Sequence, residues 1–191
     1  NHPYAKIPAT SIRKAFEELV AYLNTTGLTY TRHDNRNALI LTPAGTLKPS
    51  YDIPQTMWGG VQAYESKAPC LIVDIKGLKG FSARQIMAPF KDSWPDLTQS
   101  SISFPGIDHP GEIYLEPLAR SMVLSQNRQA LADTLRPLID GFEYCGLPAM
   151  LGIQNPDDIR LDLEQQLGVN LFEIPTMPPS ISSHTMRVSS S

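Results

Sequence analysis

The stretch "APCLIVDIKG", Ala68 to Gly77, decides the fold of this chain. It is a short, continuous run of mostly aliphatic residues, a pattern typical of a strand that is covered on both faces. Strands of this kind lie in the centre of a sheet. Two similar runs follow, "FEYCGLPAMLG" at Phe142 to Gly152 and "NLFEIPT" at Asn170 to Thr176, and we expect both to be buried strands as well.

Helical patterns separate the expected strands. "FSARQIMAPFKDSW", residues 81–94, predicts a helix capped by Ser82, and "NPDDIRLDLEQQLG", residues 155–168, predicts a helix with Asn155 as its cap and Pro156 at its first position. The segment between them is expected to hold a strand in "SISFPG", residues 101–106, and two helices within residues 113–139. Strand and helix thus alternate at lengths that favour parallel pairing through right-handed crossovers.

An amphipathic helix and an antiparallel meander are expected before this alternation. From Ser11 to Gly27 apolar residues recur at the three/four spacing of a helix, with Thr10 or Ser11 as its cap and Gly27 at its end. Three short strands within residues 28–53 follow, with a hairpin turn at Pro43-Ala44-Gly45. The predicted fold class is therefore α/β: a mixed sheet of parallel core strands joined by helices, plus an antiparallel hairpin.

The composition predicts one folded domain. A chain of 191 residues buries roughly 70% of its unfolded surface, and we expect a single α/β domain over residues 1–191 with residues 180–191 as a frayed end. The net charge is −3 and the basic residues are scattered, which argues against nucleic-acid binding. Apolar runs fall far short of the ~20 residues of a membrane helix, so we expect a soluble chain without a transmembrane segment.

The two cysteines are expected to be structural. Cys70 and Cys145 lie in apolar stretches and outside any Cys/His spacing typical of a metal site, so no metal is predicted. Buried free thiols of a cytosolic protein are the favoured interpretation, and a disulfide between them is the alternative.

Two segments carry lysine or tryptophan close to two glycines. "KGLKGF", Lys76 to Phe81, places Lys76 and Lys79 between a strand end and a helix start, where an anion can bind; the alternative is a tight turn with solvated lysines. It matches neither a dinucleotide fingerprint nor a P-loop. "MWGGV" at residues 57–61 predicts a loop with Trp58 packed in the core, or else a place where a planar ring or a partner backbone comes close.

The histidines give weak signals. His33 and His109 are expected at the surface, because neither has a carboxylate or cysteine at ligand spacing. In "IDHPGE", Asp108, His109 and Glu112 are the nearest approach to an acid/base cluster, although proximity in a loop does not show that they face one pocket.

The segment "IPTMPPS" leaves the last expected strand, where α/β sheets form ligand sites. Pro175, Pro178 and Pro179 fix φ, which pre-organises a loop that carries the hydroxyls of Thr176 and Ser180. Further on, Arg187 is a candidate ligand for a phosphate or carboxylate. A strand exit followed by a frayed tail explains the same residues equally well.

Several strings in their order resemble the middle region of the B-subunit family of anaerobic glycerol-3-phosphate dehydrogenase, which consists of flavoproteins. They are "HPYAKI", "TPAGTLKPS", "IKGLKGFSARQI", "LARSM", "LPAMLG" and "IPTMPPS", and they extend over nearly the whole chain. Members of that family bind the flavin with a glycine-rich turn that precedes this region. The resemblance therefore implies a substrate-side cap domain from a longer protein, with FMN, or else FAD, in the full-length protein and no cofactor in this chain alone.

The resemblance also implies candidate positions and partners. Pro175, Thr176, Pro178, Pro179 and Ser180 would lie near the flavin, and Lys76, Lys79 and Arg187 are the candidates for substrate or anion binding. The whole protein would take part in oxidising sn-glycerol 3-phosphate to dihydroxyacetone phosphate in anaerobic respiration, and would pass electrons to quinone. Its partners would be a catalytic flavoprotein subunit and an iron–sulfur subunit, in a cytoplasmic complex peripheral to the inner membrane.

No catalytic residue follows from the resemblance, because the arginine that follows "PPS" in the family is displaced here to Arg187, beyond a segment containing His184. The alternative function is a non-catalytic module that docks other subunits through the surface around Trp58 and the proline-rich loop. A free-standing hydrolase is disfavoured, since the sequence holds no G-x-S-x-G nucleophile motif.

Overall fold

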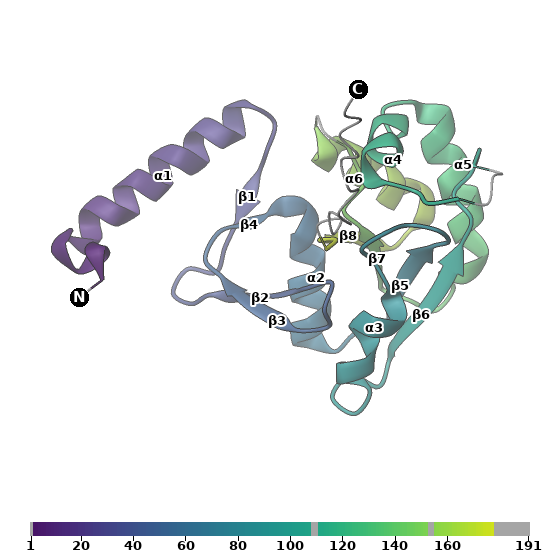
Figure 1. Cartoon of the computed structure of the whole chain (residues 1–191), viewed down its shortest axis with the longest axis horizontal. Helices are drawn as coiled ribbons and strands as arrows, with labels where there is room; N and C mark the ends of the chain where they lie inside the picture. Colours follow the sequence, from purple (N-terminus) through teal and green to yellow (C-terminus); the bar gives the residue numbers. More distant parts are fainter. Residues whose placement is uncertain (1, 108–110, 153–154, 178–191) are drawn as a thin grey trace, which may run out of the picture.

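The structure is a computed structural model that describes residues 2–107, 111–152 and 155–177 (Figure 1). Its centre is a four-stranded, all-parallel sheet in the order β6-β5-β7-β8. The strands are β5 (Cys70–Ile75), β6 (Leu97–Ile102), β7 (Tyr144–Pro148) and β8 (Asn170–Ile174). All three predicted buried strands are present, and the predicted α/β class with parallel core strands is confirmed.

Burial along the strands follows their apolar runs. Every residue of β5 except Asp74 is buried, because β5 lies between β6 and β7 and is covered on both faces. In β6, by contrast, only the end residues Leu97 and Ile102 are buried, since this strand forms an edge of the sheet. The sequence predicted β6 a few residues too late, at 101–106, because its middle is polar and the apolar signal lies at its end.

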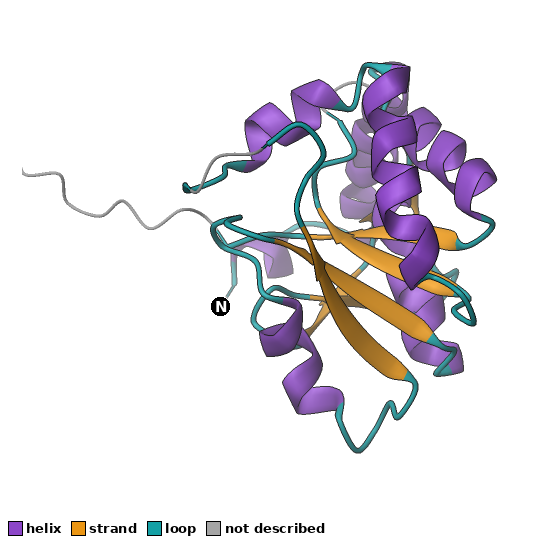
Figure 2. Ribbon diagram, turned by 90° about the vertical axis from the view of Figure 1, so that its right-hand side faces the viewer, coloured by secondary structure: helices purple, strands orange, loops and turns teal. Residues whose placement is uncertain are grey.

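Helices cover both faces of the sheet (Figure 2). They are α2 (Gln55–Ser66), α3 (Ala83–Met87), α4 (Leu115–Ser121), α5 (Ser125–Leu135) and α6 (Pro156–Leu167), with the 3-10 helices η2 (Ala88–Phe90) and η3 (Arg136–Leu138). Helix α3 contacts β5 and β6, α2 contacts β8, and α5 contacts α6. After β6 the chain crosses back over β5 to form β7, so the strand order reverses between β5 and β7.

The helix α2 corrects the prediction of a loop at residues 57–61. Gly60 of α2 and Gly146 of β7 both lie close to the ring of Phe172. A Cβ on either glycine would lie 2.7 Å from that ring. The aromatic ring of β8 therefore fills the space that these glycines leave. Glycine lowers helix propensity by about 1 kcal/mol, which hid the helix from the sequence, although Trp58 packs beside a small core as expected.

The antiparallel part consists of two separate pairs. β2 (Ala38–Leu41) pairs with β3 (Leu47–Ser50), joined by the predicted turn, where the Gly45 amide donates to the Thr42 carbonyl at 3.0 Å. β1 (Tyr30–Thr31) pairs with β4 (Ile53–Pro54) rather than with β2, so the predicted meander is wrong at its first strand. The hairpin is confirmed, and it forms a sheet of its own beside the parallel sheet.

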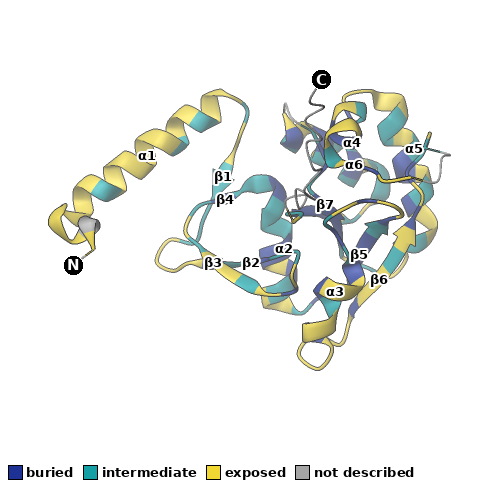
Figure 3. Cartoon of the chain, in the orientation of Figure 1, coloured by how far each residue is buried: buried dark blue, intermediate teal, exposed yellow. Residues whose placement is uncertain are grey.

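Helix α1 (Ala9–Thr25), preceded by the 3-10 helix η1 (Pro3–Lys6), extends away from the rest of the molecule (Figure 1). None of its residues is buried, as Figure 3 shows. The predicted caps are corrected at one end: the helix begins after Pro8 with no capping side chain, while Gly27 lies just beyond its end with φ +83°. A Cβ at Gly27 would lie 2.5 Å from Asn155 Oδ1, so the end of α1 is held close to α6.

Two other helix predictions were right in place and partly wrong in detail. Ser82 caps α3 as expected, accepting a hydrogen bond from the Gln85 amide at 3.3 Å, but the helical segment ends at Phe90 rather than Trp94. Asn155 does precede α6, with Pro156 at its first position, yet it makes no side-chain capping bond. Its left-handed backbone, with φ +48°, departs from the extended conformation of a capping residue.

The cysteines are free and buried, as predicted, and lie on the adjacent strands β5 and β7. Burial raises the pKa of the Cys145 thiol to about 12. Among the helices that the structure describes, none has the length and apolar character needed to cross a membrane.

Candidate functional site at the carboxyl edge of the parallel sheet

The carboxyl ends of the four parallel strands lie along one edge, and the segments that follow them meet there. In doubly wound α/β sheets, ligands bind beyond this edge, near the point where the strand order reverses. That point lies here between β5 and β7. The candidate site is therefore formed by the segments that leave β5, β6, β7 and β8.

The segments after β5 and β6 are joined by backbone hydrogen bonds. The Lys79 amide donates to the Ile113 carbonyl at 3.1 Å, and the Ile113 amide donates to the Gly77 carbonyl at 2.9 Å. Leu78 and Ile113 thereby form an isolated parallel bridge beyond the strands. These bonds hold the "KGLKGF" turn as a fixed part of the edge.

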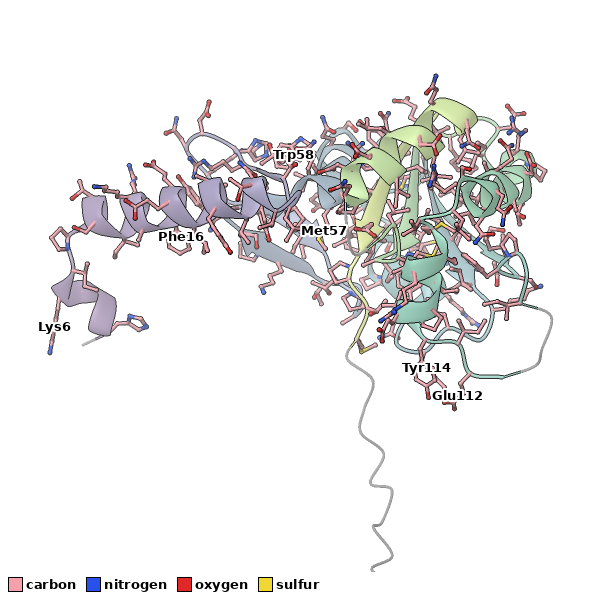
Figure 4. All side chains as sticks on the ribbon, turned by 90° about the horizontal axis from the view of Figure 1, so that it is seen from above. Lys6, Phe16, Met57, Trp58, Glu112 and Tyr114 are labelled. Atoms are coloured by element: carbon pink, nitrogen blue, oxygen red, sulfur yellow. The ribbon has the colours of Figure 1, made fainter. Side chains whose placement is uncertain are left out.

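The side chains on this bridge form an exposed polar chain. Lys79 Nζ lies 2.8 Å from Glu112 Oε1, and the Tyr114 hydroxyl donates to Glu112 Oε2 at 3.0 Å. Glu112 and Tyr114 lie side by side at the surface in Figure 4. The hydrogen bond with Glu112 raises the pKa of Lys79, and the hydrogen bonds from Lys79 and Tyr114 lower the pKa of Glu112. The ammonium of Lys79 thus already has an anionic partner within the chain.

The proline-rich segment starts beside the same turn. The Met177 amide donates to the Gly80 carbonyl at 2.8 Å. Gly80 has φ +77°, and a Cβ there would lie 2.4 Å from the Met177 carbonyl oxygen, so only glycine fits this crossing. Two segments that the sequence singled out separately, around Lys79 and around Thr176, are therefore neighbours at one edge.

The predicted site residues can now be placed. Pro175 and Thr176 are half-buried directly after β8, and Lys76 is exposed directly after β5, with its amide bonded to the Ile102 carbonyl at 2.9 Å. Of the other candidates, Pro178, Pro179, Ser180 and Arg187 lie outside the described residues, as do Asp108, His109 and His184.

Two carboxyl groups near this edge were not singled out from the sequence. Glu173 of β8 is 8% exposed and accepts a hydrogen bond from the Leu151 amide at 2.7 Å. Burial raises the pKa of Glu173, while bonds from Leu151 and Thr56 partly oppose the shift. Asp74 of β5 also has a raised pKa, because burial outweighs its hydrogen bond with the Ala83 backbone. In the sequence, both residues could have been noticed as single acidic residues within mostly apolar strands.

Glu173 links three elements at this edge. Its carboxylate connects β8 to the segment that leaves β7, through Leu151, and to the start of α2, through Thr56. These hydrogen bonds tie the segment after β7 and the start of α2 to β8.

A hollow of about 240 Å³ lies close by, between the α4–α5 turn and the start of α6. It is lined by Val123, Arg128, Asn155, Asp158 and Ile159. The guanidinium of Arg128 donates to the Met122 carbonyl at 2.9 Å and to the Val123 carbonyl at 3.0 Å, and it is also paired with Asp162. These bonds commit Arg128 to holding the turn against α6.

The other candidates do not join this edge. His33 is bonded to Glu65 at 3.0 Å, and its ring packs at 4.9 Å from that of Trp58. His33 therefore has a carboxylate partner, which the sequence did not show because Glu65 lies in α2, 32 residues further along the chain. In the described parts of the chain, no three His, Cys, Asp or Glu side chains are grouped to hold a metal ion.

The fold and this edge define a doubly wound α/β domain whose candidate ligand site combines backbone groups, hydroxyls and few charges. No family model and no solved structure matches the chain. Curated proteins do match it over almost its whole length. The chain is homologous to the B subunit of anaerobic glycerol-3-phosphate dehydrogenase, which confirms the resemblance found in the sequence.

Three of these relatives show the extent of the similarity. The B subunit of Yersinia pestis bv. Antiqua is 29% identical over 189 residues, which is 94% of this chain and 44% of the relative. That of Pectobacterium atrosepticum is 24% identical over 187 residues, covering 95% and 44%. A protein named as a probable B subunit in Halobacterium salinarum is 25% identical over 197 residues, covering 94% and 44%. The chain thus spans less than half the length of the relatives it matches.

Proposed function

We propose that this chain is the cap-type domain of a longer flavin-dependent dehydrogenase subunit, in which it closes over a flavin held by another part of the same polypeptide. The observation that supports this proposal is the homology, which extends over 94% of the chain but only 44% of the relatives, which are named as the B subunit of anaerobic glycerol-3-phosphate dehydrogenase. The whole protein would then act as an oxidoreductase on sn-glycerol 3-phosphate, with electrons passing to quinone.

We assign the flavin site to the remainder of the longer polypeptide rather than to this chain. The sequence has no glycine-rich dinucleotide fingerprint, and the cation of Lys79 at the candidate edge is already paired with Glu112. Both observations support a proposal in which the remainder of the polypeptide holds the FMN or FAD. The role we assign to this chain is to shape the surroundings of the flavin and to exclude water.

Pro175 and Thr176 are the residues we assign to that role. They follow β8 directly, and the bond between the Met177 amide and the Gly80 carbonyl fixes where the chain goes next. Lys76, exposed at the same edge, is the candidate for an anionic group of the substrate whose ammonium we favour over the paired Lys79, and Arg187, outside the described residues, stays a candidate as well. The partners we propose are a catalytic flavoprotein subunit and an iron–sulfur subunit, in line with the relatives being named as one subunit of a dehydrogenase.

The test is the visible absorption spectrum of the longer polypeptide, with this chain alone as the control. We expect oxidised flavin bands in the long form and none in the 191-residue chain. A folded long form without flavin absorption would refute the flavoprotein assignment. If the long form contains flavin, the rate at which sn-glycerol 3-phosphate bleaches the flavin is then measured in the assembled complex. Comparing wild type with Thr176→Ala and Lys76→Gln tests whether the residues at this edge affect that rate.

The alternative is a docking module without a small-molecule site. The surface around Trp58 does not favour it, because that ring packs against His33 and the small core beside β2. The observation that favours docking is the apolar face of α1, which the described chain leaves uncovered.

A further inference from the structure

The apolar face of α1 has no partner among the described residues. Ile12, Ala15, Phe16 and Leu19 follow the three/four spacing of one helix face. Phe16 is 47% exposed and Leu19 is 51% exposed. These four residues, with Ile7 and Ser11, line a shallow hollow of about 300 Å³. In Figure 4, Phe16 projects from α1 along the part of the helix that no other element covers.

An amphipathic helix without a covered face is unusual. Most helical stability in proteins comes from packing of such a face, and α1, with 17 residues, is only a little longer than the isolated helices that are marginal in water even when they are rich in alanine. Burying the exposed apolar side chains would stabilise the protein in proportion to the apolar area removed from water. The face is therefore expected to be covered in the functional protein.

A membrane surface is a poor occupant for this face. Helices that lie on membranes carry an excess of Lys and Arg on the polar face, whereas α1 has two basic residues, Arg13 and Lys14, and two acidic residues, Glu17 and Glu18. Their charges cancel, and Lys14 and Glu18 approach each other to 3.9 Å. No electrostatic attraction to anionic lipid follows from this balance.

A second copy of the chain is also disfavoured, by area. A helix of 17 residues is roughly 25 Å long and about 10 Å wide, so one face offers a footprint of roughly 250 Å². A stable interface between separate proteins buries about 800 Å² on each partner. A patch this small suits an occupant on the same polypeptide, because a covalent connection supplies an effective concentration near the millimolar range.

The relatives supply such an occupant. The matched region covers 44% of their length, so more than half of each relative lies outside it. We propose that the apolar face of α1 docks onto the part of the longer polypeptide that lies outside this chain, and that α1 joins the two parts. This inference rests on the proposed function only in requiring a longer polypeptide; it does not require that polypeptide to bind flavin.

The test measures maleimide labelling of a cysteine introduced on each side of α1. Leu19→Cys reports on the apolar face, and Lys14→Cys, whose parent side chain is 78% exposed, is the matched control on the polar side. Cys70 and Cys145 are buried and do not compete in the folded chain. The labelled position is identified by peptide mass spectrometry in the 191-residue chain and in the longer polypeptide.

We expect Leu19→Cys to react at least about tenfold more slowly in the longer polypeptide, since only transient opening exposes a docked face. Lys14→Cys should react within about twofold of the same rate in both proteins, as expected for an exposed thiol. Equal rates for Leu19→Cys in the two proteins would overturn the proposal. The flavin spectrum is recorded on the same samples, so docking without flavin and flavin without docking are separate results.

Two further outcomes would assign the face to another occupant and overturn the proposal. Concentration-dependent protection of Leu19→Cys in the longer polypeptide, with a dimer mass by light scattering, would mean a second copy. Protection of Leu19→Cys in the longer polypeptide only after phosphatidylcholine and phosphatidylserine vesicles are added would mean a membrane. Phe16→Asp should leave the secondary structure of the 191-residue chain unchanged and restore fast labelling of Leu19→Cys in the longer polypeptide.

Discussion

Strand β5 and helix α1 are both rich in apolar residues, yet the structure treats them in opposite ways. All of β5 except Asp74 is buried between neighbouring strands and helices, whereas α1 has no buried residue. The difference is that the described residues cover β5 on both faces and leave the apolar face of α1 uncovered. All four strands of the parallel sheet come from this chain, whereas we propose that α1 is covered by another part of a longer polypeptide.

The largest expected effect tests the sheet side of this comparison. Phe172→Ala should lower the free energy of unfolding by about 3–5 kcal/mol, because the ring fills the space beside Gly60 and Gly146. Urea denaturation measures it. The matched change on the other side, Phe16→Ala in α1, should stay within about 0.5 kcal/mol. Similar losses for both variants would mean that α1 packs on the domain in solution.

A smaller effect is expected where the edge segments cross. Gly106 and Gly80 have nearly the same φ, +80° and +77°, but only Gly80 faces the backbone of Met177. Gly106→Ala should therefore cost about 1–2 kcal/mol for the left-handed backbone alone, and Gly80→Ala about 1–3 kcal/mol more for the collision. Equal urea midpoints for the two variants would show that the segment after β8 does not cross at Gly80.

The pH dependence of stability tests Glu173. Its pKa in the folded chain is raised, so the folded state holds the proton more tightly than the unfolded state does. The stabilising contribution is complete below the ordinary value of 4.5 and is lost as the pH rises through the raised pKa. Glu173→Gln should remove this loss.

The measurement is a series of urea unfolding curves from about pH 4 upward, the range in which carboxyl groups titrate. Wild type should become less stable relative to Glu173→Gln as the pH rises, while the exposed Glu143→Gln keeps the wild-type profile. Parallel profiles for wild type and Glu173→Gln would contradict burial of this carboxyl group.

The smallest effect is expected at the exposed ion pair. Lys79→Gln removes the partner of Glu112, but pairs in open solvent contribute little because water and salt screen them. The urea midpoint should not change beyond experimental error, while the pKa of Glu112 measured by NMR should move back towards its ordinary value. A large drop in stability would mean that this pair holds the edge together.

Much of the fold was predictable from the sequence, since continuous apolar runs identify buried parallel strands. This is why β5, β7 and β8 were expected where they lie. Helix α2 was missed, because Gly59 and Gly60 hide a helix that depends on close packing against Phe172. The pairing of β1 with β4 was missed as well, since neither short strand carries a signal for its partner.

The candidate site was predictable only in pieces. The turn at Lys79 and the segment at Thr176 were each singled out, but their contact joins Gly80 to Met177 across nearly a hundred residues, and no local pattern encodes it. Glu173 was hidden in the same way, because its partners Thr56 and Leu151 come from other elements. The three/four spacing of α1 correctly predicts an apolar face, but spacing cannot say what covers that face.

Native-state hydrogen exchange of the 191-residue chain tests the contrast between β5 and α1 most directly, because one experiment reports on both regions. We predict that amides of β5 and β7 exchange only through global unfolding, and that amides in the middle of α1 exchange orders of magnitude faster, through local opening. Protection of α1 equal to that of the sheet, in a monomer, would contradict this prediction. It would mean that this chain covers the helix by itself.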